Sequence, residues 1–391
     1  MQSIFTLWLY FSLLKYNTYK YLEACDCFLD TGDMTIVFNL FKLEIRYIKV
    51  LLEHNQEILN QNIREIDTNI SLKNIDYEVL NKKIYDFIYC LKNKMSEENY
   101  NLLIKVLSNN LINSYEIKNN ISKLKMILNG TAGTVSYDSK NELFEYCLGF
   151  NFKSIQKNVP FHELFHLSSI YKKIGNKTIC GFRLPNGFGR MLNEGYTEHL
   201  TRKYFLNNSN EIKTASLNYY IAENISSILE EIISFEDMEK CYLNADINGL
   251  IHLMNKYISN EESYELIYNL DIISNDDIAQ ILYKSTELYC YQNINLRTMY
   301  NKVMYKYDYK LYNIEKTLIK MYIVKLSKEN NLSKDTIVNK VIDFYDKNFS
   351  NLKNINSIYK TNKDFILITM DEILNIINDT LKEKEKYIIY N

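Results

Sequence analysis

His162, Glu163 and His166 form the pattern H-E-x-x-H, in which two histidines stand four residues apart. An α-helix turns once in 3.6 residues, so residues at this spacing share one face of a helix. Both imidazoles can therefore present a nitrogen to the same metal ion, and zinc binds neutral imidazole readily in a four-coordinate site. The pattern predicts two ligands of a zinc ion.

Glu163 follows the first histidine directly, which predicts that its carboxylate lies beside the metal. There it can take a proton from a water molecule at the open coordination position and later deliver that proton to a leaving amine. Zinc assists by lowering the pKa of bound water to about 7 and by polarising a scissile carbonyl. We expect Glu163 to be the catalytic general base and then the general acid.

A second motif supplies carboxylates for the third ligand position that a catalytic zinc site requires. Residues 192–200 read LNEGYTEHL, and the spacing of Glu194 and Glu198 places both on one face of a helix. His199 adjoins the motif, but it points about 100° away from Glu198 around the helix axis. We expect His199 to be structural and the third metal ligand to be either Glu194 or Glu198.

Together the two motifs resemble the gluzincin metallopeptidases, the clan that contains thermolysin and aminopeptidase N. The resemblance covers about residues 130–205 and implies that Glu194 is the third zinc ligand. It also implies that Glu198 accepts a proton from the far nitrogen of His162. Twenty-seven residues separate His166 from Glu194, where those two families have roughly twenty, so Glu198 remains the alternative direct ligand.

Local sequence predicts the elements that position these residues. Asn158 is a suitable N-cap and Pro160 suits the first turn of a helix, which we expect to run on through residues 167–173 and to stop at Gly175. Residues 134–137 and 144–152 lead into and out of a polar turn, and the second run alternates apolar side chains at period two. A β-hairpin is predicted there, and a short strand is predicted over 179–184.

The distribution of glycine and proline predicts the architecture. Both prolines and eight of the ten glycines fall between residues 130 and 195, whereas the flanks carry few helix breakers. We therefore expect a mainly α protein with a small α+β zincin-like core, made of the β-hairpin, the HExxH helix and the Glu-ligand helix. The predicted divisions are an uncertain segment 1–33, a helical region 34–129, a metallopeptidase core 130–240 and a helical region 241–391.

Composition indicates which classes of partner and which cellular compartment to expect. The chain of 391 residues carries a formal charge of −2, which gives no sign of nucleic-acid binding. No run of 18 apolar residues is present, so we expect no transmembrane segment. The seven scattered cysteines favour free thiols in the reducing cytoplasm. The alternative is export directed by the short apolar stretch 4–14, although a basic leader and a cleavage signal are missing from it.

Three further pairs of residues carry polar side chains whose roles the sequence suggests. Peptide hydrolysis needs a donor for the developing oxyanion, and Tyr219 and Tyr220 are the candidates on the next predicted helix. Arg183 and Arg190 are expected to be solvated or structural, and Glu230 and Glu231 are expected to form a solvated helix face.

The sequence therefore predicts a zinc metallopeptidase with one Zn²⁺ per chain, held by His162, His166 and Glu194. Its partner is a peptide or protein substrate, and the resemblance implies that the peptide binds extended along the hairpin edge. Three alternatives remain open. They are a non-catalytic zinc-containing helical binding or regulatory protein, a metal-dependent hydrolase of a non-peptide amide, and a helical interaction protein in which the motif is fortuitous.

Overall fold

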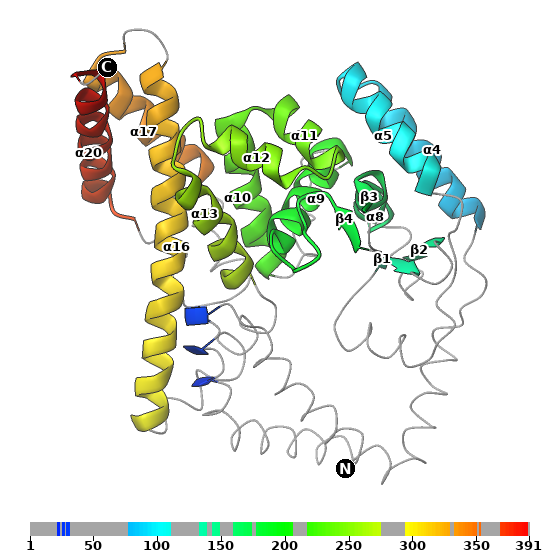
Figure 1. Ribbon diagram of the computed structural model, residues 1–391, viewed down its shortest axis with the longest axis horizontal. Coiled ribbons are helices and arrows are strands. Elements are labelled where there is room, and N and C mark those ends of the chain that lie inside the picture. Colours follow the sequence, from blue (N-terminus) through cyan, green and yellow to red (C-terminus); the bar gives the residue numbers. More distant parts are fainter. Residues whose placement is uncertain are drawn as a thin grey trace. The chain divides into compact units, whose positions relative to one another are not determined.

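A computed structural model describes residues 22–23, 26–27, 29–31, 77–110, 133–138, 143–148, 159–173, 177–205, 217–274, 294–328, 332–349, 352 and 368–389. Within these ranges the protein is mostly helical and has little strand (Figure 1). The mainly α prediction is therefore confirmed at this level. Parts of the two regions predicted to be helical, 34–76, 111–129 and 275–293, lie outside the described residues.

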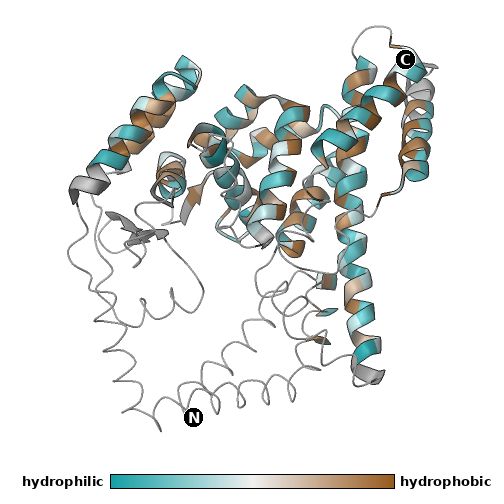
Figure 2. Cartoon of the chain, turned by 180° about the vertical axis from the view of Figure 1, so that it is seen from behind, coloured by the Kyte–Doolittle hydropathy of each residue, from teal (hydrophilic) through white to brown (hydrophobic). Residues whose placement is uncertain are grey.

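The helices are α4 (Tyr77–Lys92), α5 (Glu97–Asn110), α8 (Val159–Ser168), α9 (Arg190–Phe205), α10 (Leu217–Ile233), α11 (Phe235–Leu243), α12 (Ile247–Met254), α13 (Asn260–Ile273), α16 (Ile294–Lys328), α17 (Lys334–Asn348) and α20 (Met370–Ile389). Bands of hydrophilic and hydrophobic residues alternate along many of these helices (Figure 2), as expected of amphipathic helices that bury one face. Helix α16 runs over 35 residues without a break, and no glycine or proline interrupts that stretch.

Four short strands form two separate antiparallel hairpins. Strands β1 (Gly133–Asp138) and β2 (Leu143–Leu148) pair as the sequence predicts, and β1 lies against α8. Strands β3 (Ile170–Lys173) and β4 (Lys177–Cys180) form the second hairpin between the two motif helices. This hairpin links α8 to α9 and so connects the two sets of candidate ligands.

The predicted continuation of the HExxH helix through residue 173 is wrong, because α8 ends at Ser168. Two serine hydroxyls donate hydrogen bonds to backbone carbonyls near its C-terminal end. Ser168 donates to Leu164 O at 2.7 Å, and Ser169 donates to His166 O at 3.0 Å. The backbone N–H of Gly181 also bonds the Ser169 carbonyl at 2.9 Å. These bonds end the helix and leave the β-branched and aromatic residues that follow to pair as a strand.

The chain divides into two compact units. Unit 1 comprises 1–56, 215–221 and 257–391, and unit 2 comprises 57–214 and 222–256. Both motifs belong to unit 2, whereas α13, α16, α17 and α20 belong to unit 1. The domain limits expected from the sequence alone stay a prediction.

Unit 2 packs α8 through an aromatic cluster formed by Phe87, Phe161, Phe165 and Phe205. The rings of Phe161 and Phe205 stack with centroids 4.1 Å apart, and Phe87 meets Phe165 edge to face at 4.9 Å. Such pairs add directional attraction to the burial of large apolar surfaces. The cluster joins α4, α8 and the end of α9, so it fixes the helix that carries both histidines.

Unit 1 is organised along α16. The buried Tyr307 donates a hydrogen bond from its hydroxyl to the carbonyl of Ile273 at the end of α13, at 3.0 Å. Tyr345 on α17 bonds the carbonyl of Ile368 in the same way, also at 3.0 Å. No helix in the described part of the chain combines the length and the apolar composition that crossing a membrane requires.

Candidate metal centre

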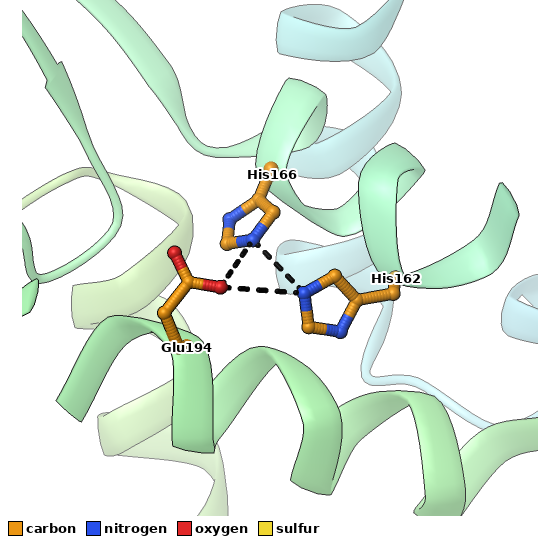
Figure 3. A group of neighbouring side chains, drawn as sticks. All are labelled: His162, His166 and Glu194. Atoms are coloured by element: carbon orange, nitrogen blue, oxygen red, sulfur yellow. Dashed lines mark hydrogen bonds and ion pairs between the residues drawn. The ribbon is translucent and has the colours of Figure 1, made fainter. Parts of the chain in front are cut away.

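His162, His166 and Glu194 bring three ligand atoms to one point between α8 and α9 (Figure 3). The Nε2 atoms of the two histidines lie 3.1 Å apart. Glu194 Oε2 lies 3.5 Å from His162 Nε2 and 3.3 Å from His166 Nε2. The three atoms thus form a nearly equilateral triangle, to which two residues of the first motif and one of the second contribute.

The size of this triangle fits a zinc ion. Ligand atoms bound to zinc at 2.0–2.1 Å in a tetrahedron lie about 3.3 Å from one another. The separations of 3.1, 3.3 and 3.5 Å bracket that value. A tetrahedral ion on these three atoms retains a fourth position that the triad does not fill, which is the arrangement of a catalytic site.

Glu198 contacts the opposite side of the His162 ring. Its Oε2 lies 3.2 Å from His162 Nδ1, and its Oε1 accepts a hydrogen bond from Arg202 Nε at 3.0 Å. Burial alone raises the pKa of the Glu198 carboxyl, but the contacts with His162 and Arg202 outweigh it and lower that pKa. Glu198 is therefore held as an anion that accepts the Nδ1 proton and turns Nε2 toward Glu194.

The three ligand side chains are strongly coupled by charge. Burial disfavours the charged form of His162, yet its contacts with Glu194 and Glu198 raise its pKa to about 9. The same histidines outweigh burial and hold the pKa of Glu194 well below its usual range. The opposite charges that the histidines and Glu194 can carry therefore attract one another across the triad.

Glu163 is buried at the side of the triad, with a relative exposure of 6%. Burial is the largest influence and raises the pKa of its carboxyl, although His162 and His166 oppose that rise. A carboxyl with a raised pKa is better suited to exchange a proton near neutral pH than an ordinary glutamate. Glu163 is outside the group of three ligand atoms and so is free for this role.

Two glycines shape the helix that carries Glu194. Gly189 precedes α9 with a positive φ of 75°, and a Cβ there would meet the backbone carbonyl of Phe182. Gly195 follows Glu194 directly, and a Cβ would lie 2.4 Å from the backbone carbonyl of Ala222 on α10. Only glycine permits this close approach of α9 and α10. The glycine of the second motif is thus explained by packing next to the candidate ligand.

His199 lies on a different face of α9 from the ligands, in contact with α10. Its Nε2 lies 3.2 Å from Glu230 Oε1, and its Nδ1 lies 3.9 Å from Glu223 Oε1. Lys203 donates to the same Glu230 oxygen at 2.7 Å. The expectation that Glu230 forms part of a solvated face is therefore wrong, because Glu230 is buried and His199 and Lys203 on α9 contact its carboxylate. Single-sequence patterns do not show which charged residues find such partners.

This ion cluster predicts a pH dependence of stability. Burial lowers the pKa of His199, but Glu223 and Glu230 outweigh burial and raise it to about 9. The pKa of His199 is higher in the folded state than in the unfolded state, where it is about 6.5, so proton binding by His199 stabilises the fold. This stabilisation is complete below about pH 6.5 and is lost as the pH rises through 9. We expect the difference in unfolding free energy between the parent chain and His199→Gln to shrink by about 3 kcal/mol between about pH 6 and pH 10.

Chemical denaturation followed by far-ultraviolet circular dichroism measures this difference at each pH. Other titrating groups act in both proteins and cancel in the difference. A difference that stays constant over the whole pH range contradicts the assignment of a buried imidazolium at His199.

The remaining candidates are not among the three residues that bring ligand atoms together. Arg183 and Arg190 are exposed at the ends of the turn between β4 and α9. Tyr219 is half-buried and Tyr220 is buried in the first turn of α10, in a segment assigned to unit 1. Their role as oxyanion donors stays a prediction.

Four residues around His166 were not anticipated as site residues. They are Asn193, Thr197 and Tyr242, which are buried, and Cys180, which is half-buried. Thr197 and Asn193 stand four apart within the second motif, so helical spacing contained a signal for that pair. Tyr242 lies 45 residues from Thr197 and reaches it only through tertiary packing.

Comparison of the chain with protein-family models, curated proteins and solved structures gives no match. The candidate metal centre is therefore described from the geometry of this chain alone. These are the triangle of ligand atoms, the anionic Glu198 behind His162 and the buried Glu163 beside them.

Proposed function

We propose that this protein is a zinc-dependent metallopeptidase with one Zn²⁺ per chain. His162, His166 and Glu194 are the proposed ligands. The observation that carries the proposal is the triangle of 3.1, 3.3 and 3.5 Å between their ligand atoms, which matches the edges of a tetrahedron around zinc. The intact Glu163 favours catalysis over a purely structural site, which has no use for that carboxylate and usually has four protein ligands.

Each side chain has a definite task in this proposal. When bound, zinc supplies Lewis acidity that acidifies water and polarises the peptide carbonyl. Glu163 removes a proton from the attacking water with its carboxylate and then transfers that proton to the leaving amine. Glu198 holds the Nδ1 proton of His162, so that this ring presents the Nε2 lone pair. Glu163 thus acts on the reactants, whereas Glu198 acts on a ligand.

The proposed core consists of the β1–β2 hairpin, α8 and α9, in the arrangement of a zincin. The position of β1 against α8 supports it. A peptide in extended form can pair its backbone with the edge of such a hairpin, which is the β-addition mode of recognition. The described cysteines, Cys27, Cys90, Cys180 and Cys241, are free thiols and support a cytoplasmic location.

Elemental analysis combined with a substrate panel tests the function. We expect about one zinc per purified chain. We also expect cleavage of members of a peptide library, loss of cleavage on treatment with a chelator, and recovery when zinc is restored. The panel includes non-peptide amides, so that the products identify the class of bond that is hydrolysed.

Each contrary result points to a specific alternative. Bound zinc without cleavage of any amide supports a non-catalytic zinc protein. Cleavage restricted to non-peptide amides supports the corresponding hydrolase. A chain that takes up no zinc after dialysis in zinc-containing buffer refutes the metal centre and favours a helical interaction protein.

A further inference from the structure

The far nitrogen of His166 faces a small group of polar side chains that the proposed chemistry leaves without a role. His166 Nδ1 lies 3.3 Å from Asn193 Nδ2, 3.4 Å from Thr197 Oγ1 and 3.7 Å from Cys180 Sγ. Thr197 Oγ1 in turn lies 2.6 Å from the hydroxyl of Tyr242. Both hydroxyl side chains are completely buried, so water does not satisfy them.

Counting protons settles the direction of each bond at Thr197. A threonine hydroxyl has one proton to donate and two lone pairs to accept with. Thr197 donates its proton to the carbonyl of Asn193 at 2.7 Å. The short contact with Tyr242 therefore requires the tyrosine hydroxyl to be the donor. One lone pair of Thr197 Oγ1 is then left, and it faces His166 Nδ1.

We propose that Thr197 and Tyr242 are positioning residues that hold His166 in the tautomer able to bind the metal, a proposal that rests on the zinc site proposed above. A neutral imidazole that binds a metal through Nε2 carries its proton on Nδ1 and needs an acceptor there. Thr197 Oγ1 is that acceptor. The hydrogen bond from Tyr242 polarises the hydroxyl of Thr197 and occupies one of its two lone pairs. The second lone pair of Thr197 Oγ1 is then directed at the His166 ring.

Thr197 thereby does for His166 what Glu198 does for His162, with a neutral hydroxyl in place of a carboxylate. Asn193 cannot take this role. Its Oδ1 already accepts the backbone N–H of Phe182 at 3.1 Å, which turns its amide N–H groups toward the ring. An amide N–H directed at Nδ1 favours the tautomer in which Nδ1 carries no proton. The hydroxyl acceptor of Thr197 is needed to favour the opposite tautomer.

Cys180 is the competing acceptor, and it is the weaker one. Its sulfur is 3.7 Å from Nδ1, and its thiol also lies 3.5 Å from the His166 carbonyl, to which it can donate. Thiol sulfur accepts hydrogen bonds weakly. The two acceptors give different predictions for substitution, which makes the proposal testable at single residues.

Zinc affinity of the full chain, measured by competition with a chromophoric chelator, is the first readout. We expect Thr197→Val to weaken zinc binding by about 10–100-fold, the usual loss when a group that orients a ligand is removed. Thr197→Ser keeps the hydroxyl and is expected to restore affinity. Tyr242→Phe is expected to weaken binding less than Thr197→Val, and Cys180→Ala is the matched control that leaves it unchanged.

The second readout is the Nδ1–H signal of His166 in zinc-loaded protein that carries ¹⁵N-labelled histidine. We expect this signal to be protected from exchange in the parent chain and in Thr197→Ser. It is expected to be lost or shifted in Thr197→Val, while the corresponding signal of His162, held by Glu198, stays in place. A general loosening of the fold would disturb both signals, so the His162 signal separates orientation from structure.

Equal zinc affinity of Thr197→Val and the parent chain overturns the proposal, as does loss of affinity in Cys180→Ala alone. If Thr197→Val does not fold, the comparison of Tyr242→Phe with Thr197→Ser decides the question in the same way. Neither readout involves peptide cleavage. A parent chain that binds zinc through this network but cleaves no amide refutes the peptidase proposal and leaves the positioning role intact.

Discussion

Glu163→Gln is expected to retain bound zinc and to lower kcat/KM for peptide cleavage by about 10²–10⁴-fold, the range that a positioned general base contributes. The substitution keeps the size of the side chain but removes the carboxylate that accepts a proton from water. Because Glu163 is outside the three ligand atoms, the metal is expected to stay. Initial rates over a range of peptide concentrations, together with zinc content, measure both effects on the same sample.

Glu231→Gln is the matched control, since it makes the same chemical change at an exposed position on α10. It is expected to cleave peptide at the parent rate. Full activity in Glu163→Gln contradicts the assigned general base. Loss of zinc in Glu163→Gln instead places that carboxylate among the ligands.

Glu194→Ala is expected to abolish stoichiometric zinc binding, whereas Glu198→Ala is expected to weaken zinc affinity by about 10–100-fold. The difference follows from geometry. Glu194 Oε2 lies within 3.5 Å of both Nε2 atoms, whereas Glu198 contacts His162 at its far nitrogen, Nδ1. Elemental analysis after dialysis, followed by chelator competition on the variant that keeps zinc, measures the two losses separately.

The order of the two losses is the decisive result. A larger loss in Glu198→Ala reverses the assignment and makes Glu198 the direct ligand. Equal zinc content in both variants and in the parent chain moves the metal away from α9 altogether.

The parts of the site that follow from helix geometry could be predicted from the sequence. The four-residue spacing of His162 and His166 fixes a shared face in any helix, and the same rule aligns Glu194 with Glu198. In the structure, side chains of these two pairs contact one another between α8 and α9. The β1–β2 hairpin was predictable for a similar reason, since alternation at period two is a local property of a strand.

The parts that depend on tertiary partners could not be predicted. The end of α8 is set by hydroxyl bonds and by a backbone bond from Gly181, which no helical propensity contains. The burial of Glu230 depends on His199 and Lys203 from another helix. Tyr242 is one of 34 tyrosines, and only its position against Thr197 distinguishes it from the rest.

The β3–β4 hairpin has a consequence for how the centre assembles during folding. It connects α8 to α9 directly, so His166 and Glu194 are only 28 positions apart in the chain. Closing a loop of that length costs about 3 kcal/mol of chain entropy, apart from a constant that shorter loops share. All three candidate ligand atoms therefore come from one continuous stretch of chain, so the entropy cost of their approach is that of a single short loop.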